Sequence, residues 1–257
     1  MQTNTKLYAA FSCDKGDLRP SNDDRVLVKK YQVSGEEWGM FLVADGMGSN
    51  MLGSEAAGII VDHLSRWWDN DLAQILSLSF EVKYCLESLD NTIKKANRKV
   101  AKLQSDKVAG STLSLVLIVG QEYVIRHVGD SRIYSIGLNY GIRQLTQDHT
   151  YVAAKIKEGL LTAQEAKNHP KRNILTKCIG TKNTPDMFKY EGKLAPNEYL
   201  LLCSDGFYKA ASEEAIIHTV FNPTLSLEKK VGALRSSIAT GSASDNVSII
   251  LVHVAEA

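Results

Sequence analysis

Four aspartates stand at the ends of short apolar runs, in separate places along the chain. They are Asp45, Asp130, Asp205 and Asp245, of which the first three follow an apolar run and the last precedes one. A single Asp-Gly step after a strand is most often a simple turn. Four aspartates at strand ends favour another explanation, because a scaffold holds a strand end rigidly. We therefore expect a fold in which several buried strands present carboxylates at fixed points.

Seven apolar runs predict strands. They cover residues 7–13, 39–44, 112–119, 123–128, 132–136, 199–203 and 247–254. Several of them are apolar without alternation, which is typical of strands covered on both faces. Two longer stretches, 54–68 and 81–103, carry their apolar residues on one helical stripe. Because neighbouring runs around residue 120 are close enough to pair as a hairpin, the pattern indicates an α+β fold with helices packed outside antiparallel sheets.

Three further helix starts are visible in the sequence. Thr162 and Glu165 have the spacing of a capping box, which predicts a helix start within residues 150–180. Ser212 is a predicted N-cap for a helix through Val220. Ser226 is a predicted N-cap for a helix through about residue 239.

Carboxylates that converge on one place repel one another unless a cation neutralises them. Ligand sets made of oxygen atoms alone select hard cations, so the pattern favours Mg²⁺ or Mn²⁺ over zinc. Gly46 follows Asp45 directly, and its lack of a side chain would let a backbone carbonyl approach an ion. The sequence therefore predicts a site for divalent cations at the strand ends.

Seven short motifs, in this order, resemble those of the metal-dependent protein serine/threonine phosphatases of the PPM (PP2C-type) family, in its compact bacterial form. They lie at residues 19–24 (RPSNDD), 43–48 (VADGMG), 109–113 (AGSTL), 128–132 (VGDSR), 145–149 (LTQDH), 203–206 (CSDG) and 244–247 (SDNV). Each motif is weak alone, but the ordered set covers residues 7 to 254 and is highly specific. The resemblance implies a four-layer αββα sandwich, with two antiparallel sheets flanked by helix pairs. It also implies a single domain over residues 1–257, with a flap subdomain at about 149–180 that influences substrate selectivity.

The resemblance also implies roles for individual residues. Asp45 would bridge two metal ions, Asp205 and Asp245 would complete the shell of one of them, and Asp130 with Asp205 would form a weaker third site. The implied metal ligands are Asp24, Asp45, the carbonyl of Gly46, Asp130, Asp205 and Asp245, with Asp23 acting through water. The implied catalytic residues are Arg19, Asp45, Asp205 and Asp245, with Arg19 binding the substrate phosphate.

The expected chemistry agrees with these residue types. Two metal ions ~4 Å apart lower the pKa of a shared water, which would then attack phosphorus at neutral pH. Arg19 offers two parallel N–H donors to a phosphate, which a lysine does not. The expected cofactors are two Mn²⁺ or Mg²⁺ ions with room for a third, and the expected substrates are proteins phosphorylated on serine or threonine. A Ser/Thr kinase is the expected opposing enzyme, by family analogy alone.

Two positions depart from the family pattern. The acidic pair is Asp23-Asp24, where the family usually has Glu-Asp, and the shorter side chain would keep a water between itself and the metal. Met47 stands where animal members have the histidine assigned as the general acid. Bacterial members commonly carry methionine there, so the group that protonates the leaving oxygen is open, with a metal-bound water as the default candidate.

Composition limits the possible partners and the location. The chain has 257 residues, and 30 Lys and Arg against 29 Asp and Glu give a net charge of +1. This balance provides no electrostatic surface for nucleic acid or an anionic membrane. The longest strongly apolar run, residues 113–119, is far shorter than the ~20 residues that span a bilayer. The 4 cysteines include no C-x-x-C pair, so we expect reduced thiols in a cytoplasmic monomer.

Three alternative readings of the sequence are weighed against this one. Cys13 and Arg19 form the C-x5-R pattern of cysteine-dependent phosphatases, but the acids between them would repel both a thiolate and a phosphate. A faint P-loop pattern after Gly48 lacks its lysine. The remaining alternative is a pseudophosphatase that binds phosphoproteins without cleaving them. Loss of a metal-ligand aspartate would indicate that alternative, and none is missing.

Overall fold

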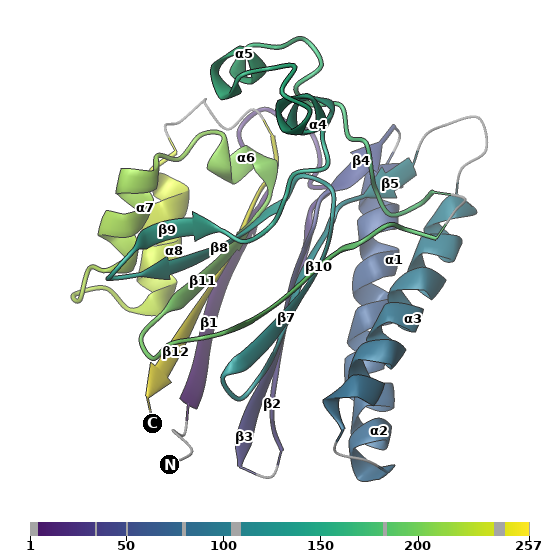
Figure 1. Ribbon diagram of the computed structural model, residues 1–257, viewed down its shortest axis with the longest axis vertical. Coiled ribbons are helices and arrows are strands. Elements are labelled where there is room, and N and C mark those ends of the chain that lie inside the picture. The colour runs from purple at the N-terminus through teal and green to yellow at the C-terminus, as the bar shows by residue number, and fades with distance from the viewer. Residues whose placement is uncertain are drawn as a thin grey trace.

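Two five-stranded antiparallel sheets form the centre of the molecule (Figure 1). The computed structural model describes residues 5–33, 35–49, 51–78, 81–103, 109–181, 184–238 and 245–256. In order across the first sheet, the strands are β1 (Thr5–Asp14), β12 (Val247–Glu256), β11 (Tyr199–Cys203), β8 (Arg132–Gly137) and β9 (Gly141–Gln144). In order across the second sheet, they are β10 (Phe188–Lys193), β7 (Glu122–Val128), β6 (Leu113–Val119), β3 (Glu36–Ala44) and β2 (Arg25–Val33).

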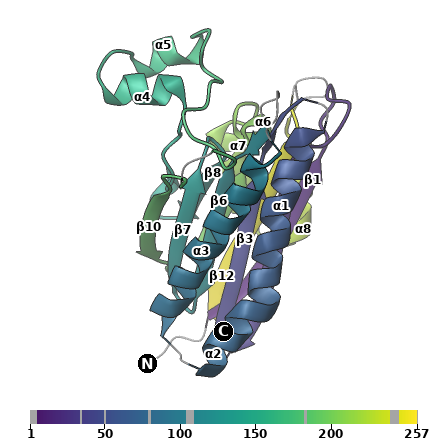
Figure 2. The same ribbon diagram turned by 90° about the vertical axis from the view of Figure 1, so that its right-hand side faces the viewer.

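Helices cover the outer face of each sheet (Figures 1 and 2). The second sheet is covered by α1 (Leu52–Arg66), a π-helical turn η1 (Trp67–Leu72), α2 (Ala73–Leu78) and α3 (Val82–Ala101). The first sheet is covered by α7 (Glu213–Val220) and α8 (Leu227–Ser236). The predicted α+β class and its four-layer αββα arrangement are therefore confirmed.

The apolar residues of the strands bury both sheet faces. Phe41 and Val43 of β3 meet Ile250 and Val252 of β12 between the sheets. The face of β6 that points away from the first sheet includes Leu113 and packs under α1 and α3. This double burial explains why β6 and β11 read as continuous apolar runs in the sequence.

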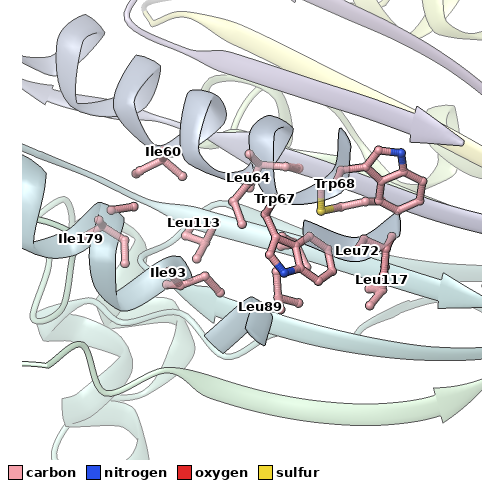
Figure 3. Close-up of a cluster of buried hydrophobic side chains, with 14 of the residues drawn as sticks. Ile60, Leu64, Trp67, Trp68, Leu72, Leu89, Ile93, Leu113, Leu117 and Ile179 are labelled. Atoms are coloured by element: carbon pink, nitrogen blue, oxygen red, sulfur yellow. The ribbon is translucent and has the colours of Figure 1, made fainter. Parts of the chain in front are cut away.

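The outer core under α1 and α3 is built around a tryptophan (Figure 3). Trp67 is only 1% exposed and packs with Leu64, Leu89 and Ile93. Its indole Nε1 donates a hydrogen bond to Ser88 Oγ at 3.0 Å, so the one polar atom of the ring has a partner inside the core. The π-helical turn at the end of α1 thus brings a large aromatic ring into the layer.

A segment with two short helices stands beyond one end of the sandwich (Figures 1 and 2). These helices are α4 (Tyr151–Lys157) and α5 (Ala163–Lys167). The predicted capping box is confirmed, because Thr162 Oγ1 accepts from the Glu165 amide and Glu165 Oε2 accepts from the Thr162 amide. The segment returns to the sandwich where Ile179 exchanges two backbone hydrogen bonds with Ser111 of the short strand β5 (Ala109–Ser111).

Candidate active site

The acidic residues lie at the end of the sandwich that carries α4 and α5. Asp45 follows β3, and Asp24 precedes the paired strand β2. Asp205 is the first residue of α6 (Asp205–Tyr208), directly after β11, and Asp245 precedes the adjacent strand β12. Asp130 comes two residues after β7. These elements end on the same side of the molecule (Figure 1).

The carboxylates are close enough to interact electrostatically. Burial raises the pKa of Asp45 well above its usual range, and the charges of Asp24, Asp205, Asp130 and Asp245 each raise it further. Five aspartates from five different strand ends therefore share one electrostatic environment. Such a group is unfavourable in its charged form until a cation enters or protons bind.

Two of the carboxylates have oxygen atoms without a partner. Asp24 is 0% exposed, and neither of its carboxylate oxygens has a hydrogen-bond partner among the described residues. The same holds for the buried Oδ1 of Asp205. Burial, followed by the charges of Asp205 and Asp245, raises the pKa of Asp24 to about 7. Burial, followed by the charge of Asp205, likewise raises the pKa of Asp130 to about 7.

The serine hydroxyls beside Asp24 do not replace a cation. Ser248 and Ser204 lower the pKa of Asp24, but the Ser248 hydroxyl lies 3.4 Å from the sulfur of Cys13. The Ser204 hydroxyl lies 3.4 Å from a backbone carbonyl. Because each hydroxyl is directed to another acceptor, the described residues leave both Asp24 oxygens without a hydrogen-bond partner, so an ion can bind them.

Two basic side chains each bind one oxygen of the group. Arg19 Nη2 donates to Asp245 Oδ2 at 2.7 Å, and this pair also raises the pKa of the arginine. Lys209 Nζ donates to Asp205 Oδ2 at 2.6 Å. Among the residues that the structure describes, no three or more His, Cys, Asp or Glu side chains stand in a geometry ready to hold an ion. Of the five carboxylates, Asp245 is paired with Arg19 and Asp205 with Lys209.

Asp23 is placed differently from Asp24. Asp23 is half-buried, and its Oδ1 accepts a hydrogen bond of 3.4 Å from the hydroxyl of Ser21. Its backbone amide donates to Asn246 Oδ1 at 2.8 Å. The structure therefore brings Asp24 into the buried acidic group and leaves Asp23 at its edge.

Two glycines allow the close packing that the site needs. A Cβ at Gly46 would collide with the carbonyl of Gly53 and lie 2.6 Å from the carbonyl of Asp23. A Cβ at Gly206 would collide with the carbonyl of Asn246. Gly46 belongs to the short strand β4 (Gly46–Gly48), which pairs with β5. The two Asp-Gly steps therefore serve close backbone approach, which the simple-turn explanation does not require.

Asn246 organises the loop that carries Arg19 and Asp24, a role that the sequence motif did not assign to it. Besides accepting from the Asp23 amide, its Nδ2 donates to the carbonyls of Lys15 at 2.8 Å and Ser21 at 2.9 Å. Asn246 is 6% exposed. One buried amide thus satisfies backbone groups along residues 15–23 and holds this loop against β12.

Cys13 does not have the surroundings of a catalytic thiolate. Its sulfur accepts hydrogen bonds from Asn22 Nδ2 at 3.3 Å and Ser248 Oγ at 3.4 Å. Burial raises the pKa of the Cys13 thiol, and the charge of Asp24 raises it further. The half-buried Cys13 is therefore a protonated residue of β1, which argues against the cysteine mechanism.

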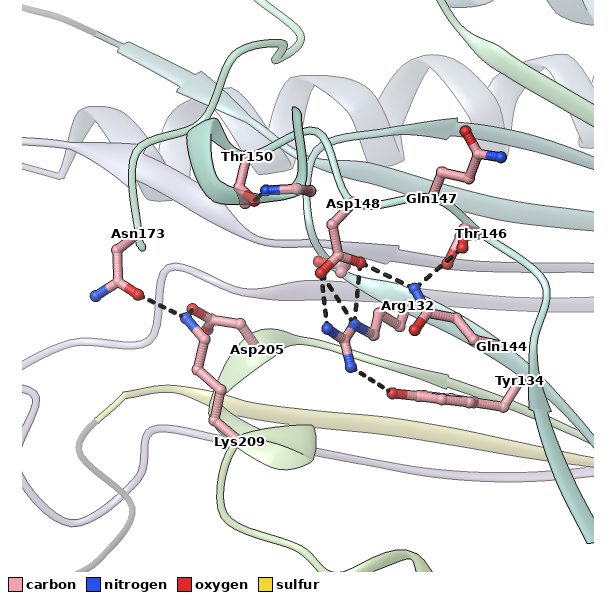
Figure 4. Close-up of polar contacts among 12 residues, drawn as sticks. Arg132, Tyr134, Gln144, Thr146, Gln147, Asp148, Thr150, Asn173, Asp205 and Lys209 are labelled. Atoms are coloured by element: carbon pink, nitrogen blue, oxygen red, sulfur yellow. Dashed lines mark hydrogen bonds and ion pairs between the residues drawn. The ribbon is translucent and has the colours of Figure 1, made fainter. Parts of the chain in front are cut away.

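An ion pair anchors the first end of the α4–α5 segment (Figure 4). Arg132 donates to both carboxylate oxygens of Asp148, with Nη2 2.7 Å from Oδ2, and its guanidinium carbon lies 3.8 Å from the ring centroid of Tyr208. Tyr208 belongs to α6, which begins with Asp205. The pair therefore joins the base of the segment to the helix that carries a candidate metal ligand.

A buried histidine pair lies next to this anchor. His127 Nε2 lies 3.0 Å from the carbonyl of Gln147, and its Nδ1 lies 2.9 Å from the hydroxyl of Ser114. Because a carbonyl only accepts, Nε2 carries the proton of the neutral ring. The His149 ring lies 5.0 Å from the His127 ring, and its Nδ1 accepts from the amide of Gly129, directly before Asp130. Both rings therefore have structural contacts.

We expect the His127 network to make stability depend on pH. Burial, followed by the charge of His149, lowers the pKa of His127 to about 3, well below the value of about 6.5 in an unfolded chain. Below pH 6.5 the unfolded chain binds a proton that the folded protein excludes, so stability falls as pH falls. Between pH 7 and pH 5 this one group should cost about 2 kcal/mol. Urea unfolding of wild type and His127→Gln at both pH values measures the difference.

The matched control for this prediction is His218→Gln, which changes an exposed residue of α7. That variant should keep the pH dependence of the wild type. Equal pH dependence in wild type and His127→Gln would contradict the prediction.

Comparisons with known proteins place the chain among bacterial phosphatases. The family model for protein phosphatase 2C matches residues 19–240. The chain is 32% identical over 250 residues to protein phosphatase PhpP of Streptococcus pneumoniae, covering 95% of this chain and 96% of the relative. The solved serine/threonine phosphatase of S. agalactiae is 29% identical with a TM-score of 0.84, covering 96% of this chain and 99% of that one.

A third comparison concerns the fold alone. The catalytic domain of the serine/threonine phosphatase PstP, solved in complex with two manganese ions, is 24% identical with a TM-score of 0.79, covering 98% of this chain and 99% of that one. In the described part of the chain, no helix is both long and apolar enough to cross a membrane.

The family match extends over most of the chain and includes all but one of the acidic strand ends, the exception being Asp245. The chain belongs to the protein phosphatase 2C family.

Proposed function

We propose that this metal-dependent phosphoprotein phosphatase hydrolyses phosphoserine and phosphothreonine with water activated by two divalent ions. The observation that carries the proposal is that both carboxylate oxygens of Asp24 and Oδ1 of Asp205 are buried without a hydrogen-bond partner among the described residues. They lie inside a group of mutually repelling carboxylates. Burying a charged group away from water costs free energy unless an opposite charge binds beside it. A pair of divalent ions supplies that counter-charge.

In this proposal the donor set consists of oxygen atoms. Asp45, the carbonyl of Gly46 and Asp24 would serve one ion, and Asp45, Asp205 and Asp245 would serve the other. Oxygen donors select Mn²⁺ or Mg²⁺, and the relative PstP was solved with manganese. When bound, the ions would supply an activated water and neutralise the phosphate charge.

The side chains around this set have their own tasks. Arg19 is 53% exposed at its side chain, beside the acidic group, and Asp245 fixes one of its terminal nitrogens. A guanidinium in this position can hold two phosphate oxygens and orient the phosphorus toward the carboxylates. The segment at 149–180 would act as the flap, and its exposed Lys157, Lys167, Lys171 and Arg172 would attract an anionic phosphopeptide.

The first test is hydrolysis of p-nitrophenyl phosphate by the purified protein, with Mn²⁺ and then with EDTA. The proposal expects turnover that needs the metal, followed by release of phosphate from phosphoserine and phosphothreonine peptides. Equal, low rates in both conditions would contradict it. That outcome would instead support the pseudophosphatase alternative, which no observation on this chain favours.

Arg19→Ala should mainly weaken phosphate binding. Because the guanidinium makes charge-assisted contacts to the phosphate in this proposal, we expect the KM for small phosphoesters to rise roughly 10- to 100-fold, equivalent to about 1.5–3 kcal/mol. Arg19→Lys keeps the charge without the fork and should recover only part of this loss. An unchanged KM in Arg19→Ala would remove the arginine from the phosphate site.

We also propose an opposing enzyme, a cellular location and a domain organisation for this protein. A Ser/Thr kinase would supply the phosphorylated substrates, because a phosphatase of this kind removes what such a kinase adds. We propose a cytoplasmic monomer, consistent with the near-zero net charge and sparse cysteines. We also propose that residues 1–257 form one domain, since both sheets contribute ligands to one site.

A further inference from the structure

Lys209 reaches both the acidic group and the α4–α5 segment (Figure 4). It follows the last residue of α6, and its backbone amide donates to the carbonyl of Asp205 one turn earlier. This spacing puts the two side chains on the same face. Lys209 Nζ donates to Asp205 Oδ2 at 2.6 Å and to Asn173 Oδ1 at 3.0 Å. One ammonium group therefore joins a candidate metal ligand to the flap.

The same ammonium also acts on Asp130. Asp130 interacts electrostatically with both Asp205 and Lys209, so the three charged groups lie close together. Asp130 is buried, with an exposure of 6%. The ammonium is thus associated with both carboxylates that the family resemblance assigns to a third, weaker metal ion.

We propose that the Lys209 ammonium replaces a third metal ion between Asp130 and Asp205, so that this chain binds two divalent ions. The proposal rests on the proposed function, because it concerns the same metal centre. It makes Lys209 a positioning residue, since it acts through Asp205 and the flap.

The two oxygens of Asp205 are divided in a way that suits this arrangement. Oδ2 is engaged by Lys209, whereas Oδ1 is buried and without a partner in the described part of the chain. One oxygen can therefore serve the metal pair while the other stays on the lysine. A further divalent ion at Oδ2 would have to displace an ammonium that is hydrogen-bonded on two sides and would be repelled by its charge.

The contact with Asn173 extends the effect to the flap. Asn173 follows Lys171 and Arg172, and all three residues are exposed. A tethered cation holds this stretch whatever the metal concentration, whereas a weakly bound ion would leave when the concentration falls. The chain would thus keep its flap docked near Asp205 before metal binds.

Metal stoichiometry tests the proposal without relying on turnover. Mn²⁺ bound per chain is measured by equilibrium dialysis with elemental analysis, at free Mn²⁺ well above the dissociation constants of the first two ions. We expect two ions for wild type and for Lys209→Arg, and three for Lys209→Met. The double variant Lys209→Met/Asp130→Asn should return to two. Lys177→Met, which removes a lysine paired with the exposed Asp186, is the matched control and should bind two.

Limited trypsin digestion in EDTA gives a second readout. Lys209→Met and Asn173→Ala should both be cleaved faster than wild type after Lys171 and Arg172, because the flap has lost its tether. Asn173→Ala leaves the lysine and Asp205 in place, so this arm is informative even if Lys209→Met folds poorly.

The outcomes separate this proposal from the proposed function. A wild type that binds three ions, or a folded Lys209→Met that still binds two, would overturn the role of Lys209 while leaving the phosphatase proposal intact. Unchanged flap cleavage in both variants would overturn the tether. A wild type that binds no Mn²⁺ and has no turnover would instead overturn the proposed function itself.

Discussion

Asp205→Asn should abolish phosphatase turnover while the protein stays folded. The substitution keeps the size of the side chain but removes its negative charge. Without that charge, Oδ1 would bind a metal ion more weakly, and the ion pair of Oδ2 with Lys209 is lost. A bound metal contributes several kcal/mol of transition-state stabilisation. Loss of about 4 kcal/mol corresponds to a fall of roughly 10³-fold in kcat/KM. Hydrolysis of p-nitrophenyl phosphate at saturating Mn²⁺, together with Mn²⁺ binding, measures the effect.

The stability of Asp205→Asn separates loss of chemistry from loss of fold. The charge of Asp205 raises the pKa of Asp24, Asp45 and Asp130, so removing it relieves repulsion in the metal-free protein. In EDTA the variant should therefore unfold at no lower urea concentration than wild type. Asp186→Asn, at an exposed carboxylate paired with Lys177, is the control and should keep full turnover. An active Asp205→Asn would refute the assignment of Asp205 as a ligand.

Asn246→Ala should lower both stability and activity. It removes three hydrogen bonds of 2.8–2.9 Å and leaves the Asp23 amide and the carbonyls of Lys15 and Ser21 without this partner. Each bond contributes about 1 kcal/mol, so we expect a loss of roughly 2–4 kcal/mol in the free energy of unfolding. Because the loosened loop carries Arg19 and Asp24, turnover should fall too.

Two comparison variants make the Asn246 prediction specific. Asn246→Asp can still accept from the Asp23 amide but cannot donate to the two carbonyls, so it should be as unstable as the alanine variant. Asn222→Ala removes only the two local hydrogen bonds that Asn222 Oδ1 accepts from Thr224. It should therefore lower the free energy of unfolding little. Urea unfolding followed by circular dichroism compares all three with wild type. A fully stable Asn246→Ala would mean that the 15–23 loop is held by other contacts.

The apolar strands were predictable, but the polar edge strands were not. All seven predicted runs are strands, because burial on both sheet faces selects continuous apolar sequences. The edge strands β2, β9 and β10 were not predicted, nor were the short strands β4 and β5. The sequences of β2 and β10 include the charged residues Lys29, Lys30, Lys189 and Glu191. The helix after Ser226 ends at Ser236, and residue 239, where it was expected to end, lies outside the described residues.

The composition of the site was predictable, but its internal contacts were not. The end of an apolar run can be located in the amino-acid sequence, so the carboxylates at these positions could be identified as a group. Which oxygen of Asp205 meets Lys209 depends on a side chain one helical turn away and on Asn173 from a distant segment. Likewise, Asn246 acts through backbone groups more than 220 positions earlier in the chain. No local sequence pattern carries such information.

The pairing of β1 with β12 imposes an order on biosynthesis. These strands pair over ten consecutive residue positions, from Thr5 with Glu256 to Asp14 with Val247, so the first described strand needs the last one as its neighbour. A ribosome emits β1 long before β12, and contacts of such high sequence separation form slowly. The second sheet and the paired strands β8, β9 and β11 can assemble during translation, whereas β1 has to wait for β12. Asp245 arrives with β12, so under the proposed function the nascent chain would stay inactive until synthesis has passed this candidate metal ligand.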